Sequence, residues 1–290
     1  MAKTKVTSFR ELLRCPPGPV DLTQFQPRAT PGLKDGKGEA SNTLPGYTER
    51  LADLQERLYA AATAGDNRRV LIVLQGMDTS GKSGVVKHVV GAVNPMGCRI
   101  QGFKSPTREE LDHDFLWRIR RALPAAGEVG VFDRSHYEDV LAVRVRELMP
   151  RAVWARRYAT INRFEERLAE DGCTVIKCFL QISADAQRER LLARLDDPAK
   201  YWKYNPSDVD DRQLWPAYQE AYAVALEKCN TESAPWYVIP SDRKWYRNYA
   251  VTRLLVEALE DLDLDWPPAD FDIAAERARL VKLPAPRQGG

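Results

Sequence analysis

The chain has 290 residues, of which 44% are hydrophobic and 29% are charged, and its formal net charge is +2. This composition is that of a globular protein, and it excludes a chain that binds polyanions through a large overall charge. A polyanion would have to be bound by a local basic surface. The five cysteines include no C-x-x-C pair, and no apolar run is long enough to span a bilayer. We therefore expect reduced thiols in a cytoplasmic protein.

The first predicted elements are an arm and a helix. Residues 1–46 are rich in proline, glycine and polar side chains, so they predict an extended N-terminal arm. Residues 47–63 place apolar side chains, Leu51 and Leu58 among them, on one face of a helix. Thr48 is the predicted N-cap of this helix.

Apolar stretches and segments of helical spacing alternate through the rest of the chain. The predicted buried strands are residues 69–75, 98–103, 127–133, 174–182 and 236–242. The predicted helices are residues 83–93, 108–123, 151–170, 184–195, 209–229 and 246–262. Strands that alternate with helices predict a five-stranded, mainly parallel sheet with helices on both faces, which is a three-layer α/β/α sandwich.

The segment GMDTSGKS, residues 76–83, matches the phosphate-loop pattern G-x-x-x-x-G-K-[ST] between the first strand and a helix. Glycines allow the tight turn that points backbone N–H groups at phosphate oxygens. Lys82 supplies a mobile charge for the transferred phosphate, and the Ser83 hydroxyl can reach a magnesium ion. The loop residues predicted to bind phosphate or nucleotide are Gly76, Met77, Thr79, Ser80, Gly81 and Ser83. A glycine-rich turn without a ligand is the alternative, and the strand and helix around the full motif argue against it.

Three further charged residues are candidates for the same site. Asp133 ends the third predicted strand, where a Walker B aspartate holds magnesium, although it could also cap a helix. Arg134 follows it, at the edge where open α/β sheets bind ligands. Asp78 lies inside the phosphate loop, where it would repel a phosphate unless it faces a metal ion or the acceptor. An Asx turn that stabilises the loop is the alternative for Asp78.

Residues 187–212 form a charged segment between the fourth and fifth strands, which is typical of the lid of a small kinase. Arg190 and Arg194 share one helix face, and Lys200 and Lys203 follow close by. A lid that closes over a phosphate excludes water and strengthens each charge contact. Acids and bases nearly balance here, so a solvated charged helix and loop is the alternative.

Two basic residues lie near the ends of other predicted elements. Lys104 follows the second strand, and Arg118 lies in the helix after it. Either could be a simple surface charge. The sequence has no guanine-binding N-K-x-D motif, which argues against a GTPase.

Longer motifs support a more specific interpretation. The segments GMDTSGKSG, GEVGVFDRSHYEDVL and RLDDPAKYWKYNPSD occur in this order, together with APWYVIPSDRKWYRN. From about residue 10 to residue 270 the chain resembles the polyphosphate kinase 2 family. The resemblance implies a thymidylate-kinase-like P-loop fold with a helical lid. It also implies transfer of the terminal phosphate of inorganic polyphosphate to a nucleotide, with Mg²⁺ as cofactor.

We therefore predict a single P-loop kinase domain at residues 47–270, with the lid at about residues 187–212. The extended arm at residues 1–46 precedes the domain, and a C-terminal tail at residues 271–290 follows it.

The resemblance also assigns residues to roles. The residues that match the family's catalytic motifs are Asp78, Lys82, Asp133, Arg134 and Arg194. Asp78 and Asp133 would share the metal, which explains an acid inside the phosphate loop. Lys104, Lys200 and Lys203 fall where the family has polyphosphate- or nucleotide-binding bases. We add Arg118 to this predicted basic channel. Ser83 departs from many relatives, which have glycine or aspartate there.

The motifs look most like those of the group that accepts both AMP and ADP. We therefore predict stepwise phosphorylation of AMP to ADP and ATP, with adenine nucleotides as partners and guanine nucleotides as a further option. Neither nucleic acid nor a membrane is a predicted partner. The N-terminal arm and the aromatic C-terminal region favour a homo-oligomer, either a dimer or a tetramer.

Two other functions remain open from the sequence. An ATP-dependent nucleoside or nucleotide kinase could use the same fold, and it would require ATP as the donor. A non-catalytic polyanion-binding protein could retain the loop, although the intact Gly81, Lys82, Asp133 and Arg134 argue against it. Product formation with polyphosphate alone separates both alternatives from the predicted enzyme.

Overall fold

The computed structural model describes residues 8–283. Its sheet has five parallel strands in the order β2-β3-β1-β4-β5. The strands are β1 (Arg69–Gln75), β2 (Cys98–Gly102), β3 (Val129–Asp133), β4 (Cys173–Gln181) and β5 (Trp236–Pro240). The five predicted strands are therefore confirmed, with small shifts at the ends of all but the first. The prediction that all five are buried was wrong for β2, which lies at the edge of the sheet and is largely exposed.

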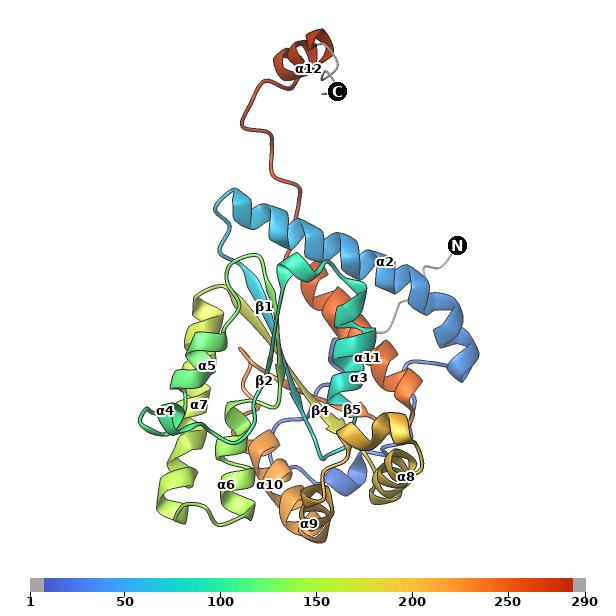
Figure 1. The fold of residues 1–290 in the computed structure, drawn as a ribbon, viewed down its shortest axis with the longest axis vertical. Coiled ribbons are helices and arrows are strands. Elements are labelled where there is room, and N and C mark those ends of the chain that lie inside the picture. The colour runs from blue at the N-terminus through green and yellow to red at the C-terminus, as the bar shows by residue number, and fades with distance from the viewer. Residues whose placement is uncertain (1–7, 284–290) are drawn as a thin grey trace, which may run out of the picture.

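Helices cover both faces of the sheet (Figure 1). In the described residues the α-helices are α1 (Phe9–Leu12), α2 (Gly36–Thr63), α3 (Lys82–His88), α4 (Arg108–Leu111), α5 (Trp117–Ala122), α6 (Ala142–Val145), α7 (Arg151–Glu170), α8 (Ala184–Leu195), α9 (Ser207–Gln213), α10 (Trp215–Lys228), α11 (Lys244–Glu260) and α12 (Ile273–Lys282). Val70, Ile72 and Leu74 of β1 pack against α2, α3 and α11. Leu71 and Val73 pack against α5, α7 and α10 on the other face. The predicted three-layer α/β/α sandwich is confirmed.

The strand order places one loop at the binding edge of the sheet. The chain runs from β1 to β2 and β3 on one side of β1, and then to β4 and β5 on the other side. Ligands of open parallel sheets bind at the carboxyl ends of the strands, where the strand order changes direction in this way. The loop that follows β1 lies at that edge.

Helix α2 begins at Gly36 rather than at Tyr47, so the predicted end of the extended arm was wrong. Thr48 is inside the helix and is not its N-cap, because its hydroxyl donates to the carbonyl of Leu44. The Glu39 carboxylate accepts two backbone N–H groups just before the helix start. Packing of α2 along α11 outweighs the low helix propensity of its glycines and its proline.

Two predicted helices are interrupted. Residues 108–123 form α4 and α5, and the Asp114 carboxylate accepts the N–H of Leu116 just before the second of them. Residues 209–229 belong to α9 and α10, because Pro216 in the first turn of α10 has no N–H with which to continue α9. Helix α3 is shorter than predicted, and a 3-10 turn follows it.

The segments at the two ends differ in how they meet the domain. The Glu257 carboxylate of α11 accepts the N–H groups of Phe9 and Arg10, at 2.9 and 3.0 Å, and so fixes α1. Beyond α11 the chain extends away from the body to α12 (Figure 1). Residues 1–7 of the predicted arm and 284–290 of the predicted tail lie outside the described residues, and the domain limits stay a prediction. Among the described residues, no helix has the length and apolar character needed to cross a membrane.

Candidate active site

The phosphate loop connects β1 to α3 at the carboxyl edge of the sheet. Gly76 and Gly81 have φ angles of 146° and 112°. These values suit glycine, because a Cβ atom would be strained in that region. Between them Thr79 also adopts a left-handed conformation, with a φ of 65°. The backbone therefore makes the tight turn that the motif predicts.

Lys82 folds back over this loop. Its side chain is 8% exposed, and its Nζ donates to the carbonyls of Gly76 at 2.8 Å and of Met77 at 3.5 Å. Neutral carbonyl oxygens are weaker partners for an ammonium group than an anion is. A phosphate that enters the loop can therefore replace them.

Arg134 donates to the Asp78 carboxylate at 2.7 Å, which joins the phosphate loop to the turn after β3. Arg134 has a φ of 66°, an uncommon conformation that redirects the chain directly after β3. Burial raises the pKa of Asp78, but the charges of Lys82 and Arg134 outweigh burial and hold this pKa below its ordinary value. Burial lowers the pKa of Arg134, but Glu138 and Asp78 raise it above its ordinary value. Both partners of the pair are therefore charged at neutral pH.

Asp133 at the end of β3 and Ser83 in the first turn of α3 are in contact. The Ser83 hydroxyl donates to the Asp133 carboxylate, with 3.3 Å between the oxygens. With Asp78 these side chains offer oxygen atoms, the ligands that Mg²⁺ prefers. In residues 8–283 no group of three or more His, Cys, Asp or Glu side chains could hold a metal alone. Mg²⁺ commonly binds one or two carboxylates together with phosphates and waters, so this donor set fits it.

The predicted lid consists of α8, a 3-10 helix (Pro198–Lys203) and α9. Arg194 at the end of α8 donates to the Lys203 carbonyl at 2.8 Å and to the Asp208 carboxylate at 3.1 Å. Burial raises the pKa of Asp208, and the negative charge of Asp78 raises it further. The lid therefore places an acid and an arginine close to the phosphate loop. Lys200 pairs with Asp197 and is otherwise exposed.

The other predicted basic residues differ in accessibility. Lys104 is exposed after β2. Arg118 is buried, and its guanidinium donates to the Lys104 carbonyl at 2.8 Å and to Glu110 at 3.5 Å. Lys203 is exposed and lies over the ring of Trp202. The structure thus makes Lys104 and Lys203 available to a ligand, while Arg118 binds the loop that carries Lys104.

Comparison with known proteins identifies the family. A family model described as Polyphosphate kinase 2 (PPK2) matches residues 37–266. The chain belongs to the polyphosphate kinase 2 family. It is 48% identical to the AMP/ADP-polyphosphate phosphotransferase of Meiothermus ruber over 252 residues. This match covers 87% of this chain and 93% of that protein.

Two further relatives agree with this assignment to the polyphosphate kinase 2 family. The ADP-polyphosphate phosphotransferase of Rhodopseudomonas palustris is 39% identical over 276 residues, covering 91% of this chain and 93% of that protein. The crystal structure of Polyphosphate Kinase 2 from Arthrobacter aurescens TC1 has a TM-score of 0.93 and 51% identity, covering 96% of this chain and 98% of that one. The predicted family, the P-loop kinase fold and the enzymatic class are confirmed.

The site of this polyphosphate kinase 2 contains charged groups whose contacts the sequence interpretation did not predict. Glu138 is partly buried beside Arg134, and burial raises its pKa against the opposing charge of that arginine. Asp208 belongs to the lid. Arg190 of α8 and Arg247 of α11 donate to carbonyls of the phosphate loop. The only sequence signal for Arg247 is a basic residue within an otherwise buried helical stretch, which does not reveal its target.

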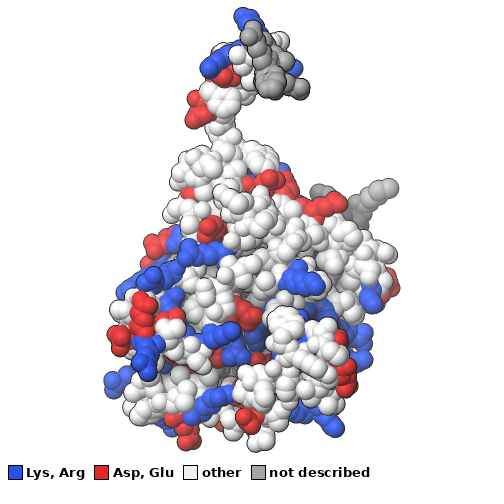
Figure 2. Space-filling view, in the orientation of Figure 1, with Lys and Arg blue, Asp and Glu red and all other residues white. Residues whose placement is uncertain are grey.

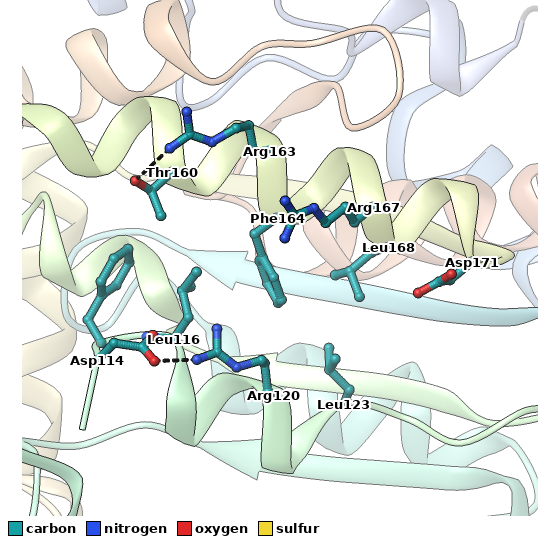
Figure 3. A pocket seen from close by; sticks show the side chains of 11 residues that line it. Asp114, Leu116, Arg120, Leu123, Thr160, Arg163, Phe164, Arg167, Leu168 and Asp171 are labelled. Carbon is teal, nitrogen blue, oxygen red and sulfur yellow. Dashed lines mark hydrogen bonds and ion pairs between the residues drawn. The ribbon is translucent and has the colours of Figure 1, made fainter. Parts of the chain in front are cut away.

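The surface charge is mixed, and the cavity between α5 and α7 does not include the phosphate loop. Figure 2 shows Lys and Arg side chains gathered over the lower part of the molecule, with acidic side chains among them. A cavity of about 580 Å³ lies between α5 and α7, where Phe164 and Leu168 face Leu123 (Figure 3). No residue of the phosphate loop lines this cavity. The catalytic assignment therefore rests on the phosphate loop of this polyphosphate kinase 2 and not on that cavity.

Proposed function

We propose that this protein transfers the terminal phosphate of inorganic polyphosphate to AMP and to ADP, which yields ADP and ATP. The observation that carries the proposal is the set of contacts around the phosphate loop. Lys82 binds a loop carbonyl, Arg134 pairs with Asp78, and Ser83 donates to Asp133. These contacts combine cations for a phosphate chain with carboxylates for a metal ion. The names of the Meiothermus and Rhodopseudomonas relatives support polyphosphate as the donor, and the first supports both acceptors.

The proposed reaction needs little from the protein beyond position and charge. An oxygen of the last phosphate of the nucleotide attacks the terminal phosphorus of polyphosphate. The bond from that phosphorus to its bridging oxygen breaks, and polyphosphate leaves one unit shorter. The attacking oxygen is already deprotonated at neutral pH, so the reaction requires no strong base. The two substrates are polyanions, and the protein must offset their repulsion.

Each group at the loop has a proposed role in this reaction. Backbone N–H groups of the loop, except that of Ser80, which donates to the Met77 carbonyl, bind the transferred phosphoryl group together with the ammonium group of Lys82. Asp78 and Asp133 would hold Mg²⁺, which when bound would supply positive charge that offsets the repulsion between the two substrates. Arg134 is kept in place by Asp78 and contacts the phosphates from the side of β3.

The lid and the loop after β2 are proposed to hold the substrates. Arg194 turns from Asp208 to the phosphates when the lid closes, because a phosphate chain carries more negative charge than one carboxylate. Lys104, Lys200 and Lys203 are proposed to line the path of the phosphate chain or the nucleotide. Arg118 is proposed to orient the segment that carries Lys104, since its donors already bind that backbone.

The finer features of the proposal are based on the resemblance to the polyphosphate kinase 2 family. We propose adenine nucleotides as the main acceptors, guanine nucleotides as a further option, and a cytoplasmic homo-oligomer of two or four chains. Light scattering during size-exclusion chromatography measures the number of chains directly. A monomer at the concentrations used for the assay would contradict the proposed assembly.

Product analysis tests the function. Purified protein is mixed with Mg²⁺ and long-chain polyphosphate, AMP is added to one sample and ADP to another, and the nucleotides are resolved by chromatography. We expect ATP in both samples. ATP from ADP alone would remove AMP as an acceptor. No product with polyphosphate, but transfer once ATP and a nucleoside or nucleotide are supplied, would establish the ordinary ATP-dependent kinase instead.

A further inference from the structure

Two arginines bind the phosphate loop from its outer side. Arg190 of α8 donates to the carbonyl of Thr79 at 2.8 Å and to that of Ser80 at 3.3 Å. Arg247 of α11 donates to the same Ser80 carbonyl at 3.2 Å. The loop carbonyls therefore have partners behind the loop. The Ser80 N–H donates to the Met77 carbonyl at 3.0 Å, within the loop. Peptide groups are planar, so a Ser80 carbonyl that is held outward keeps the N–H of Gly81 directed inward.

Arg190 also connects the loop to the rest of the binding edge. Its second terminal nitrogen donates to the carbonyls of Ser241 at 2.6 Å and Asp242 at 2.9 Å, just after β5. The same helix carries Arg194 one turn later. Arg190 thus fixes three parts relative to one another: the phosphate loop, the end of β5 and the start of the lid.

Neither arginine forms an ion pair with a carboxylate in the described residues, although Arg247 is only 3% exposed. A buried cation without a charge partner is costly for stability. Burial, together with the positive charge of Arg190, lowers the pKa of Arg247 to about 10. Both arginines still carry their charge at neutral pH. A bound phosphate chain would offset this concentration of positive charge.

A glycine outside the phosphate-loop pattern makes room for Arg247. A Cβ atom at Gly84 would lie 2.5 Å from Nη2 of Arg247, and Gly84 has no unusual backbone conformation that would itself require glycine. The pattern ends at Ser83 and makes no demand on this position. The close approach of the guanidinium therefore accounts for glycine here.

We propose that Arg190 and Arg247 are positioning residues, which together hold the Ser80 carbonyl outward so that the Gly81 N–H faces the bound phosphate, while Arg190 also fixes the Thr79 carbonyl. The proposal rests on the proposed function only in taking a phosphate chain as the ligand. It gives Gly84 the separate role of admitting Arg247 beneath the loop.

A double-mutant cycle tests the proposal. The variants are Gly84→Ala, Arg247→Met and the two combined, with Gly91→Ala as a matched control because a Cβ there meets only ordinary contacts. Binding of tripolyphosphate is measured by calorimetry, kcat and KM are measured separately, and thermal unfolding is followed for each variant. Each single variant should weaken tripolyphosphate binding about tenfold, the usual scale for losing a charge-assisted hydrogen bond. Their melting temperatures should change little.

The combined variant is decisive. Removal of Arg247 makes space for the new methyl group, so Gly84→Ala should cause no further loss in the Arg247→Met background. If the losses of tripolyphosphate affinity in the two single variants multiply in the combined variant, the proposal is overturned. Unchanged tripolyphosphate binding in both single variants would also overturn it. Arg190→Lys, which keeps one donor, should retain more binding than Arg190→Ala. If the wild-type protein binds ATP but not tripolyphosphate, the donor proposal fails, and the same cycle measured with ATP still tests the arginines.

Discussion

The Asp78 carboxylate and the Arg134 guanidinium lie 2.7 Å apart, so an acid of the phosphate loop is paired directly with the residue that follows β3. An unpaired carboxylate at this position would repel the phosphates that the loop binds. The charges of Arg134 and Lys82 keep Asp78 ionised, and one of its two oxygens remains free of Arg134. The pair thus explains how the loop tolerates an acid and leaves it able to bind a metal ion.

Replacement of Asp78 separates these roles. Asp78→Asn keeps the shape of the side chain but removes its charge, so kcat should fall about a hundredfold if the carboxylate holds metal, or about 3 kcal/mol of transition-state stabilisation. The Mg²⁺ concentration needed for half-maximal rate should rise. Steady-state rates across a Mg²⁺ titration measure both effects. Nearly unchanged activity would make Asp78 a residue that only shapes the turn.

Lys82 should be essential for turnover and unimportant for folding. Lys82→Ala removes the charge that contacts the transferred phosphate, and a loss on the order of 10² to 10³-fold in kcat is expected. The control is Lys87→Ala, an exposed lysine on the same helix, which should retain full activity. Circular dichroism shows whether each variant is folded. A folded and fully active Lys82→Ala protein would contradict the proposed phosphate-loop mechanism.

Arg194 tests the lid. Arg194→Ala should lower kcat by roughly tenfold to a hundredfold, because the lid would close without its charge on the phosphates. Arg188→Ala, on the exposed side of the same helix, should leave kcat unchanged. Rates and melting temperatures are measured together. A lower melting temperature with unchanged kcat would assign Arg194 to structure, through its contact with Asp208.

A buried ion pair should make stability depend on pH. Lys177 donates to Glu165 at 2.6 Å, and both side chains are 0% exposed. Burial raises the pKa of Glu165, but Lys177 and His136 outweigh it and hold the pKa below its ordinary value of 4.5. The native state therefore binds fewer protons than the unfolded chain below pH 4.5. Stability from the pair is complete above this pH and is lost as the pH falls through the lowered pKa.

Urea unfolding measures this contribution. Glu165→Gln should cost about 3–5 kcal/mol at neutral pH, because it leaves the Lys177 charge buried without a partner. The combined Glu165→Gln and Lys177→Met variant should recover most of that loss. The difference in stability between the wild-type protein and Glu165→Gln should shrink as the pH is lowered below 4.5. A difference that stays constant would show that the pair is not ionised in the folded protein.

The sheet could be predicted because its central strands are short, mostly apolar runs, as β1 is from Val70 to Leu74. The start of α2 could not be predicted, because the first part of this helix contains glycines and Pro45, which have low helix propensity. Contacts with α11, which is distant in the chain, make this part helical. The break before α10 was signalled by Pro216. Helical periodicity on both sides concealed that signal.

The candidate site also contains residues whose setting could be predicted from the sequence and residues whose setting could not. Lys82 lies in a local motif whose spacing fixes its geometry, and the structure places it against the loop as expected. Arg247 reaches the loop from a helix that begins more than a hundred residues later in the chain, and no local pattern reveals the contact. Arg118 was predicted to line a basic channel, but burial and its contact with the Lys104 carbonyl give it a different setting. Contacts between residues that are distant in the sequence can be predicted only when the fold is known.

Transfer of labelled phosphate tests the central claim most directly. The wild-type protein is incubated with Mg²⁺, ADP and ³²P-labelled polyphosphate, with no ATP added, and the nucleotides are separated. We predict label in the terminal phosphate of ATP with the wild-type protein and none with Lys82→Ala. Absence of label with the wild-type protein, when the same preparation phosphorylates a nucleotide acceptor from ATP, would contradict polyphosphate as the donor.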